Sequence, residues 1–451
     1  MNTPKQIARG LVRIEIPILL ALYLYFILTD ALPPAAIALI LTIWAMRAWL
    51  ARKISTRTPF DIPIILLLIL LPFNLAISPN LFLSLPKIYG IILGIAFFYA
   101  IVNHISSPRD LKLAIFLLAL LGLAIAIAGL IGTDWAQSKI ISASFLYDRL
   151  PRFIQGIPRS IAGGFARNGI GGTLTFTIPL LAAMLSAIVI SRERREREIS
   201  ESRMEISRGV YSERSRTARN DTARFWVSWI IAVALALSLI TLALTQSRGG
   251  ILGVTVGLLA LVVWKKPRIG LGILAAGLLI LIVLVSLGRV GFIANLISDG
   301  TLASRMEVWQ RGLMMAQDFP FTGIGIGTYN QVAHALYPFF IAAPDEVVPH
   351  AHNQFLEVAV DLGIPGLTAY LGLLAAFGYC AVRAYRAASD ENVRALIVGL
   401  VCGMIAQHVF GLTDAFILGT KPGLLMWVYF GIVAACYSQG KRLNGNGART
   451  T

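Results

Sequence analysis

The sequence predicts an all-α polytopic membrane protein with about 12 transmembrane helices, and two observations support this fold class. Hydrophobic residues make up 57% of the 451 residues and charged residues only 14%, whereas a soluble domain carries about a quarter charged residues. Apolar runs of about 20 residues, long enough to cross the hydrocarbon core of a bilayer, recur along the chain. We therefore treat residues 1–451 as a single transmembrane domain.

Each predicted span is an apolar segment bounded by charged or turn-forming residues. The first lacks a small-residue cleavage site and is followed at once by a second, so we expect a retained helix rather than a signal peptide. No internal repeat strong enough to suggest an inverted-repeat transporter stands out. The twelve predicted spans are residues 11–29, 33–50, 62–78, 88–104, 113–132, 168–190, 225–245, 250–264, 270–287, 352–382, 395–413 and 422–438.

Basic residues fall in the short loops on one side of these spans, for example Arg47, Lys265, Arg383 and Lys441. The positive-inside rule makes this side cytoplasmic and places both termini there. The placement accounts for the net charge of +16 without a nucleic-acid partner. The charged loop 191–224, with ten arginines and seven acids, falls on the same side. We expect a solvated insert, helical in part or disordered, whose arginines could also meet anionic membrane lipids.

The opposite side carries two larger loops, residues 133–167 and 288–351. We expect amphipathic helices in the second and larger of them. Several arginines lie on this side although the topology rule disfavours them there, and an anionic ligand would supply the reason. They are Arg149, Arg152, Arg159, Arg167, Arg248, Arg289, Arg305 and Arg311.

The segment TQSRGGILG joins two spans and places Arg248 at an external helix–helix turn. An arginine offers a planar fork of donors that suits phosphate, and Ser247 with the free amides of the next helix could help to hold the anion. The alternative is an arginine that snorkels or sets topology, which fits the external side poorly.

The segment LASRMEVWQRGLMMAQDFP predicts an amphipathic helix lying on the membrane surface. Ser304 and Glu307 have the spacing of a capping box, so we expect the helix to start at Arg305 and to stop before Pro320. Arg305 in the first turn either faces an anion or pairs with Asp318 or Glu307.

Two glycine-rich segments lie on the same side. GFARNGIGGT brings Arg167 and Asn168 to the start of a span, where they could contact a phosphate or a sugar while the glycines allow close packing. GIGIG (residues 323–327) lacks the preceding strand and following lysine of a phosphate loop, so we expect a flexible connection.

The segment VPHAHNQFLEVAVDLGIPGL places His350 and His352 where the second external loop enters a span. A histidine suits proton transfer near neutral pH, and an interfacial hydrogen bond is the alternative. We expect no metal site, because residues two apart do not share a helix face and no acidic cluster accompanies them beyond Asp345 and Glu346. Glu357 and Asp361 lie on one face, as either a packing contact or part of a polar cavity.

The last segment resembles the signature of the O-antigen ligases: a histidine, then Asn, Ser or Gln, nine residues, a glycine and another small residue three positions on. His352, Asn353, Gly363 and Gly366 occupy these positions. The SRGG and SRMEVW segments resemble two further segments of this family, in the same order. The similarity covers roughly residues 160–370, and the span count extends it over the chain.

The resemblance implies a GT-C-type glycosyltransferase of the bacterial inner membrane. Such an enzyme transfers a glycan from undecaprenyl pyrophosphate to lipid A–core on the periplasmic face, without a metal or another cofactor. It implies that His352 is the base and that Arg248 and Arg305 grip the pyrophosphate, which leaves open whether His350 takes the proton instead. The substrate-binding residues expected on these grounds are Arg167, Asn168, Ser247, His350 and Asn353.

Three other functions remain open from the sequence, and one of them is that of a relative that glycosylates protein. An O-antigen polymerase would use the same donor with a second lipid-linked glycan as acceptor, and its sequence pattern is nearly the same. A lipid or anion transporter would place its cations within the spans and would usually show repeat symmetry. The singled-out residues gather at one face instead, which favours an enzyme.

Overall fold

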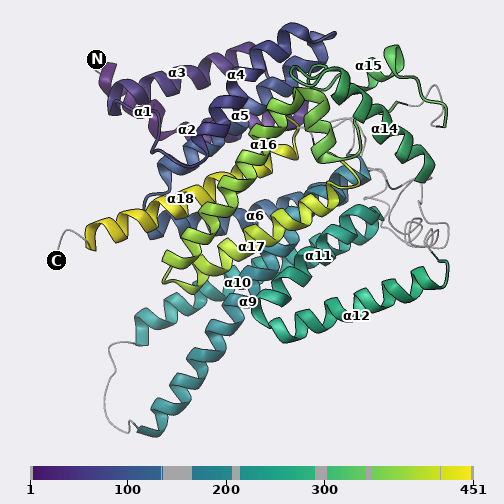
Figure 1. The fold of residues 1–451 in the computed structure, drawn as a ribbon. Helices are drawn as coiled ribbons and strands as arrows, with labels where there is room; N and C mark the ends of the chain where they lie inside the picture. Colours follow the sequence, from purple (N-terminus) through teal and green to yellow (C-terminus); the bar gives the residue numbers. More distant parts are fainter. Residues whose placement is uncertain are drawn as a thin grey trace.

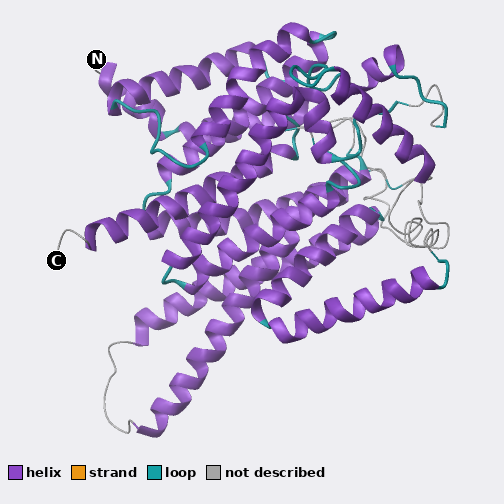
Figure 2. Ribbon diagram, in the orientation of Figure 1, coloured by secondary structure: helices purple, strands orange, loops and turns teal. Residues whose placement is uncertain are grey.

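The computed structural model describes residues 4–133, 135, 165–205, 214–289, 302–341, 347–416 and 418–447 and shows a bundle of long helices (Figure 1). Throughout the described part of the chain, every named element is an α-helix (Figure 2). The N-terminal helices are α1 (Pro4–Arg13), α2 (Glu15–Thr29), α3 (Pro34–Ala51), α4 (Asp61–Ile77), α5 (Leu81–His104), α6 (Pro108–Gly132) and α9 (Arg167–Glu205). The others are α10 (Arg214–Thr245), α11 (Arg248–Lys265), α12 (Pro267–Ser286), α14 (Leu302–Asp318), α15 (Tyr329–Leu336), α16 (Gln354–Ala387), α17 (Glu391–Phe410) and α18 (Gly423–Gly447).

The predicted fold class is confirmed. Among the described residues, 10 helices are long and apolar enough to cross a membrane, and α1 with α2 forms a bent pair that makes an eleventh span. The helix α4, with 17 residues, is a shorter apolar helix. Each of the twelve predicted segments falls on one of these helices, so the protein is a multi-pass membrane protein.

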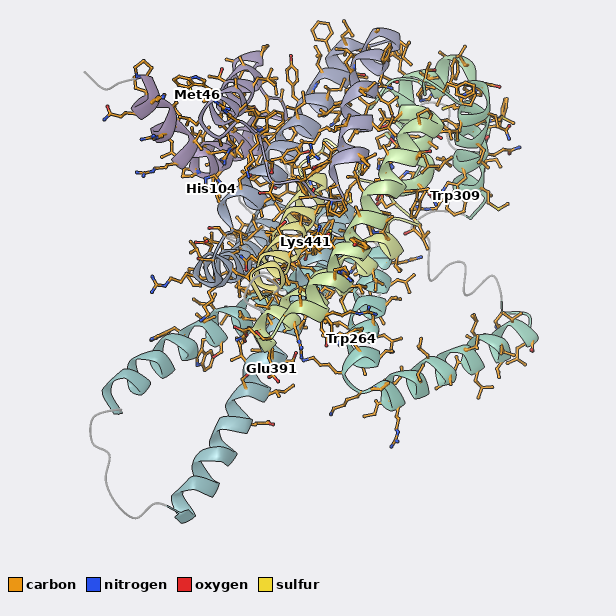
Figure 3. All side chains as sticks on the ribbon, turned by 60° about the vertical axis from the view of Figure 1, so that its left-hand side comes forward. Met46, His104, Trp264, Trp309, Glu391 and Lys441 are labelled. Carbon is orange, nitrogen blue, oxygen red and sulfur yellow. The ribbon has the colours of Figure 1, made fainter. Side chains whose placement is uncertain are left out.

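The two ends of the bundle differ in what they carry. Both termini and the far ends of α9 and α10 lie at the left of Figure 1, whereas α14 and α15 lie at the right. Figure 3 turns the left end toward the viewer and labels His104, Glu391 and Lys441 there, with Trp309 of α14 on the other side. This arrangement agrees with the predicted alternation of loops. The charged insert continues α9 and α10 as helix over its described residues.

The centre of the bundle is built by α9, α11, α16, α17 and α18. The helix α17 packs against α9 and α11, and α18 packs against α5 and α16. The helices α11 and α17 approach closely at Gly257. A methyl group on this residue would lie only 2.8 Å from the carbonyl oxygen of Cys402. Small residues allow such contacts between membrane helices. In the centre, Trp427, Tyr370 and Tyr429 are fully buried.

The capping box predicted for α14 is wrong. The helix begins at Leu302, and the carboxylate of Glu307 accepts hydrogen bonds from the backbone N–H groups of Phe340 (2.6 Å) and Ile341 (2.8 Å). Glu307 therefore holds the chain that returns from α15 and does not cap its own helix. The spacing of Ser304 and Glu307 matches a capping box. It contains no information about the distant residues Phe340 and Ile341, which Glu307 contacts in the fold.

The prediction that the GIGIG segment is a flexible connection is also wrong. The backbone N–H of Ile326 donates to Asn74 of α4 (2.9 Å), and that of Gly327 donates to Asp361 of α16 (3.1 Å). The segment is thus held between two helices. Asp361 acts as a packing contact here, one of the two alternatives open from the sequence.

The span predicted over residues 352–382 is broken. Gly363 has φ 70° and ψ −176° within α16, so the helix consists of two parts that meet at this residue. The backbone N–H of Ile364 donates to the carbonyl oxygen of Pro320 (2.7 Å), and a methyl group on Gly363 would lie 2.8 Å from the same oxygen. The first part of α16 and the chain after α14 therefore pack as one unit.

Candidate active site

The loop of residues 411–416, between α17 and α18, is where the predicted site residues meet. Gln354, the first residue of α16, holds both ends of this loop. Its backbone N–H donates to Gly411 O (2.7 Å), its Nε2 donates to Phe416 O (2.9 Å), and its Oε1 accepts from Phe416 N (2.7 Å). The buried Gln354 thereby fixes the loop against the helix that follows the histidines.

The chain before α16 is held in one conformation by its neighbours. Asn353 Oδ1 accepts from the backbone N–H groups of Phe355 and Leu356 (both 3.1 Å), so this residue is the N-cap of α16. An asparagine is a preferred residue at that position. On the other side, the fully buried carboxylate of Glu357 accepts from Ala351 N (2.6 Å).

His352 has a left-handed backbone conformation with φ 49°. Such a conformation is uncommon for a residue other than glycine and persists where surrounding contacts hold it. The indole Nε1 of Trp309, on α14, donates to His352 O (3.3 Å). The imidazole is therefore aimed by contacts from α14 and α16.

Asp414 lies between the two histidine rings. Its Oδ1 is 3.4 Å from His350 Nε2 and 3.4 Å from His352 Nδ1. The ring centroids are 4.4 Å apart, and the backbone N–H of His352 donates to His350 Nδ1 (3.2 Å). Together these three side chains form a cluster, which we call the His–Asp cluster. In it, Asp414 can orient a histidine that accepts a proton.

Two members of the His–Asp cluster have shifted pKa values. Burial lowers the pKa of His350 to about 4; Asp414 acts in the opposite direction, whereas His352 and Arg305 add to the lowering. Burial alone would raise the pKa of Asp414. The contacts of Asp414 with His352 and His350, together with the hydrogen bond from Ala415 N, outweigh burial and lower the pKa of this carboxyl. Asp414 is therefore ionised at neutral pH, whereas His350 is not.

The His–Asp cluster also has a spacing that could hold a divalent cation, since one ligand atom from each residue lies within 4.8 Å of the others. The sequence argument against a metal considered the helix face of the two histidines and the acids close to them in sequence. It did not include a carboxylate from another loop. That no metal is needed stays a prediction.

Arg305 reaches the loop 411–416 from the first turn of α14, where its Nη1 donates to Thr413 O. The acids considered as its partners have other contacts: Glu307 lies 3.7 Å from Arg311, and Asp318 accepts from the Tyr337 hydroxyl (2.5 Å). The guanidinium of Arg305 therefore contacts Thr413, the residue that precedes Asp414 in the loop.

Arg248 begins α11 beside the same loop. A methyl group on Gly249 would lie 2.6 Å from Thr413 Oγ1, so the start of α11 packs directly on the loop. Ser247, expected to bind substrate, is 1% exposed, and its hydroxyl accepts from Gly250 N (3.3 Å). It is the N-cap of α11, and the residue after it, Arg248, is half-buried.

Arg167 and Asn168 lie in the first turn of α9 and are half-buried. This turn lies close to the start of α11: a methyl group on Gly171 would lie only 2.5 Å from Ser247 Cβ. The arginines Arg149, Arg152 and Arg159, considered with them from the sequence, lie outside the described residues.

Among the helices that begin at this end of the bundle are α9, α11, α14 and α16. A helix N-terminus carries a partial positive charge, so these ends add to the charges of Arg167, Arg248 and Arg305. The arrangement favours the binding of a strongly anionic group next to a histidine that a carboxylate orients.

Residues 233–371 match the family model described as O-antigen ligase. This chain carries an O-antigen ligase family domain. The family that the sequence motifs predicted is thereby confirmed, and its members are glycosyltransferase-like ligases and polymerases that act on lipid-linked glycans in membranes. No curated protein matches the chain.

The residues that match the family model run from within α10 to the middle of α16. They include Arg248, Arg305 and His352, whereas Arg167 and Asp414 lie outside the matched residues. The sequence analysis missed Asp414 and Gln354. The available signal for Asp414 was an acid between the last two spans, on the same predicted side as the histidines.

Proposed function

We propose that this protein is an O-antigen ligase, which transfers a glycan from undecaprenyl pyrophosphate to lipid A–core on the periplasmic face of the inner membrane. The single observation that carries the proposal is the connection of His352 and Arg305 to adjacent residues of one loop, Asp414 and Thr413. A base for a hydroxyl thus lies beside a fixed cation for a phosphate. Family membership supports the proposed substrate classes.

In the proposed reaction, the hydroxyl oxygen of the acceptor attacks the anomeric carbon of the glycan. Its proton passes to His352 while the bond from the anomeric carbon to the pyrophosphate oxygen breaks. Arg248 and Arg305 stabilise the negative charge that develops on the departing pyrophosphate. Because pyrophosphate is already a good leaving group, positioning and cationic stabilisation provide most of the catalysis. The displacement occurs in one step and inverts the anomeric centre.

A reconstituted transfer reaction tests the proposal. Purified protein receives a glycan-loaded undecaprenyl pyrophosphate with lipid A–core in one reaction, and with additional donor alone in the other, both with a chelator. We expect product on lipid A–core that is lost in His352→Ala and Arg248→Ala. Arg268→Ala serves as the control, because Arg268 lies at the other end of the bundle.

The outcomes separate the candidate functions. Elongated lipid-linked glycan would identify a polymerase. Wild-type activity in Arg248→Ala would remove that residue from the site, and dependence on an added metal would contradict the metal-independent mechanism. Movement of lipid across the membrane without transfer would identify a transporter.

A further inference from the structure

The proton positions in the His–Asp cluster follow from its geometry. The backbone N–H of His352 points at Nδ1 of His350 across 3.2 Å. An N–H group is a donor, so Nδ1 must present its lone pair to it. In a neutral imidazole one nitrogen is the donor and the other the acceptor. The single proton of His350 therefore sits on Nε2, which faces the carboxylate of Asp414 at 3.4 Å.

The same contact keeps His350 neutral. A second proton on Nδ1 would point at the backbone N–H of His352 and remove this hydrogen bond. Charged groups face the ring from the surrounding elements: Asp414 from the loop 411–416, His352 from its own loop and Arg305 from α14. Glu357 of α16 takes the N–H of Ala351 between the histidines. Burial, together with Arg305 and His352, outweighs Asp414 and lowers the pKa of His350 to about 4.

His352 has a different environment. Its Nδ1 is buried and has no hydrogen-bond partner among the residues that the structure describes, and Asp414 Oδ1 lies 3.4 Å away. Contacts of this kind often shorten when substrate binds. Because Asp414 is an acceptor, a proton on Nδ1 of His352 is favoured, which leaves the lone pair on Nε2. Asp414 itself is fixed by Ala415 N, which donates to Oδ1 (2.9 Å).

We infer that His350 is a positioning residue: it stays neutral, donates from Nε2 to Asp414, and thereby directs that carboxylate to Nδ1 of His352, whose Nε2 alone accepts the proton. This inference rests on the proposed function, in which a histidine deprotonates the acceptor. It assigns the proton to His352, whereas the sequence left open whether His350 takes it instead.

The proposed step balances in protons and electrons. The acceptor O–H bond breaks, its proton goes to Nε2 of His352, and the oxygen lone pair forms the new bond to the anomeric carbon. The electron pair of the old carbon–oxygen bond leaves with the pyrophosphate. The imidazolium of His352 is stabilised by the ionised Asp414, and His350 keeps its single proton throughout.

A divalent cation in the His–Asp cluster is incompatible with this arrangement. To bind a cation through Nε2, His350 would need a lone pair there, so its proton would move to Nδ1. The hydrogen bond from the backbone N–H of His352 would then be lost. The inferred tautomers and a metal bound by all three residues are therefore mutually exclusive, and the proton positions decide between them.

The first test measures the tautomers directly. The full chain, labelled with ¹⁵N-histidine and placed in lipid nanodiscs, contains five histidines. Spectra of His350→Gln and His352→Gln assign the two signals. We expect His350 to be neutral and protonated on Nε2 from about pH 5 to 8, and the neutral form of His352 to carry its proton on Nδ1. Nδ1 protonation or titration of His350 near neutral pH would overturn the inference.

The second test separates positioning from proton acceptance. In His350→Gln the amide can still accept from His352 N and donate to Asp414, so we expect kcat to fall by no more than about tenfold. His350→Phe keeps the ring volume without the donor and should lower kcat by about 100-fold or more. His352→Gln should abolish transfer. Equal losses in His350→Gln and His352→Gln would contradict the assignment.

The two tests also distinguish failure of the inference from failure of the proposed function. The tautomers are read without turnover. If the wild-type protein transfers no glycan but shows the expected tautomers, the proposed function fails and the arrangement of the His–Asp cluster stands. If it transfers glycan with His350 protonated on Nδ1, the function stands and the positioning role is wrong.

Discussion

At the scale of the single residue, the orientation of His352 depends on side chains that are distant in sequence. Asp414 faces its Nδ1 from the loop before α18, and Trp309 holds its backbone carbonyl from α14. A histidine that lacks such a carboxylate has no fixed tautomer, so the fraction of molecules that present Nε2 to the substrate falls. The proposed chemistry therefore depends on Asp414 as much as on the motif.

The change Asp414→Asn should lower glycan transfer strongly. An asparagine keeps the size of the side chain but can place its NH₂ group toward the histidines, which favours the wrong tautomer and removes the charge that stabilises the imidazolium. We expect a loss of about 10²- to 10⁴-fold in kcat, measured by reconstituted transfer. Asp318→Asn is the matched control, since Asp318 accepts from Tyr337 at the same end of the bundle. A loss under tenfold would remove Asp414 from the mechanism.

The stability of the fold should decrease in acid because of His350. Its pKa is about 4 in the folded protein against 6.5 ordinarily, so the unfolded chain binds more protons between these values. Folding free energy is therefore lost as the pH falls from about 7 to 4, by at most about 3 kcal/mol from this residue. Asp414, with its lowered pKa, acts in the same direction.

Thermal unfolding in detergent at several pH values measures this effect. The decrease in Tm between neutral and acidic pH should be smaller in His350→Gln than in the wild-type protein. His334→Gln, at an exposed position, is the control and should show the wild-type dependence. The same dependence in His350→Gln would show that His350 is not the group responsible.

The site residues that the sequence predicted belong to local sequence patterns, whereas those that it missed act through contacts with residues distant in sequence. His352 and Asn353 belong to a local pattern, and the N-cap role of Asn353 depends only on the next residues of its helix. Asp414 is one acid in a short loop, and its role depends on contact with residues about sixty positions earlier. No helical period or spacing rule contains that information, so only the folded chain identifies it.

At the scale of the element, α16 positions the site because it is broken. The break at Gly363 lets the first part of the helix pack with α14 and the GIGIG segment, while the second part continues into the bundle. The family signature predicted a glycine at this position, and the apolar run predicted one span. A run of apolar residues has the same appearance whether the helix is straight or broken, so the break was not predictable from hydropathy.

The change Gly363→Ala should destabilise the protein. The residue has φ 70°, which alanine adopts with strain of about 1–3 kcal/mol, and the added methyl group would lie 2.8 Å from Pro320 O. Gly378→Ala in the same helix is the matched control, because nothing lies within 4 Å of a methyl group there. Thermal unfolding in detergent should show a lower Tm only for Gly363→Ala. An unchanged Tm would mean that α16 accommodates a continuous helix at this point.

At the scale of the whole molecule, the two ends of the bundle have opposite chemical character. The histidines, the three site arginines and four helix N-termini gather at one end, and the basic loops predicted as cytoplasmic belong to the other. Charge placement in the sequence was sufficient to assign residues to two ends, because topology depends on loop composition alone. It could not show which loops touch, since that depends on how the helices pack.

The proposed orientation predicts which end of the bundle a thiol reagent reaches from outside. Cys380, Cys402 and Cys436 are replaced by alanine, and single cysteines are then introduced as Val347→Cys at the site end or Arg268→Cys at the other end. Val347 is 71% exposed and Arg268 is also exposed, so both positions are open to a reagent. With the active site facing the periplasm, a membrane-impermeant maleimide should label Val347→Cys in spheroplasts and Arg268→Cys only after the membrane is permeabilised. The reverse pattern would place the His–Asp cluster in the cytoplasm, where a glycan already carried to the outer leaflet could not reach it.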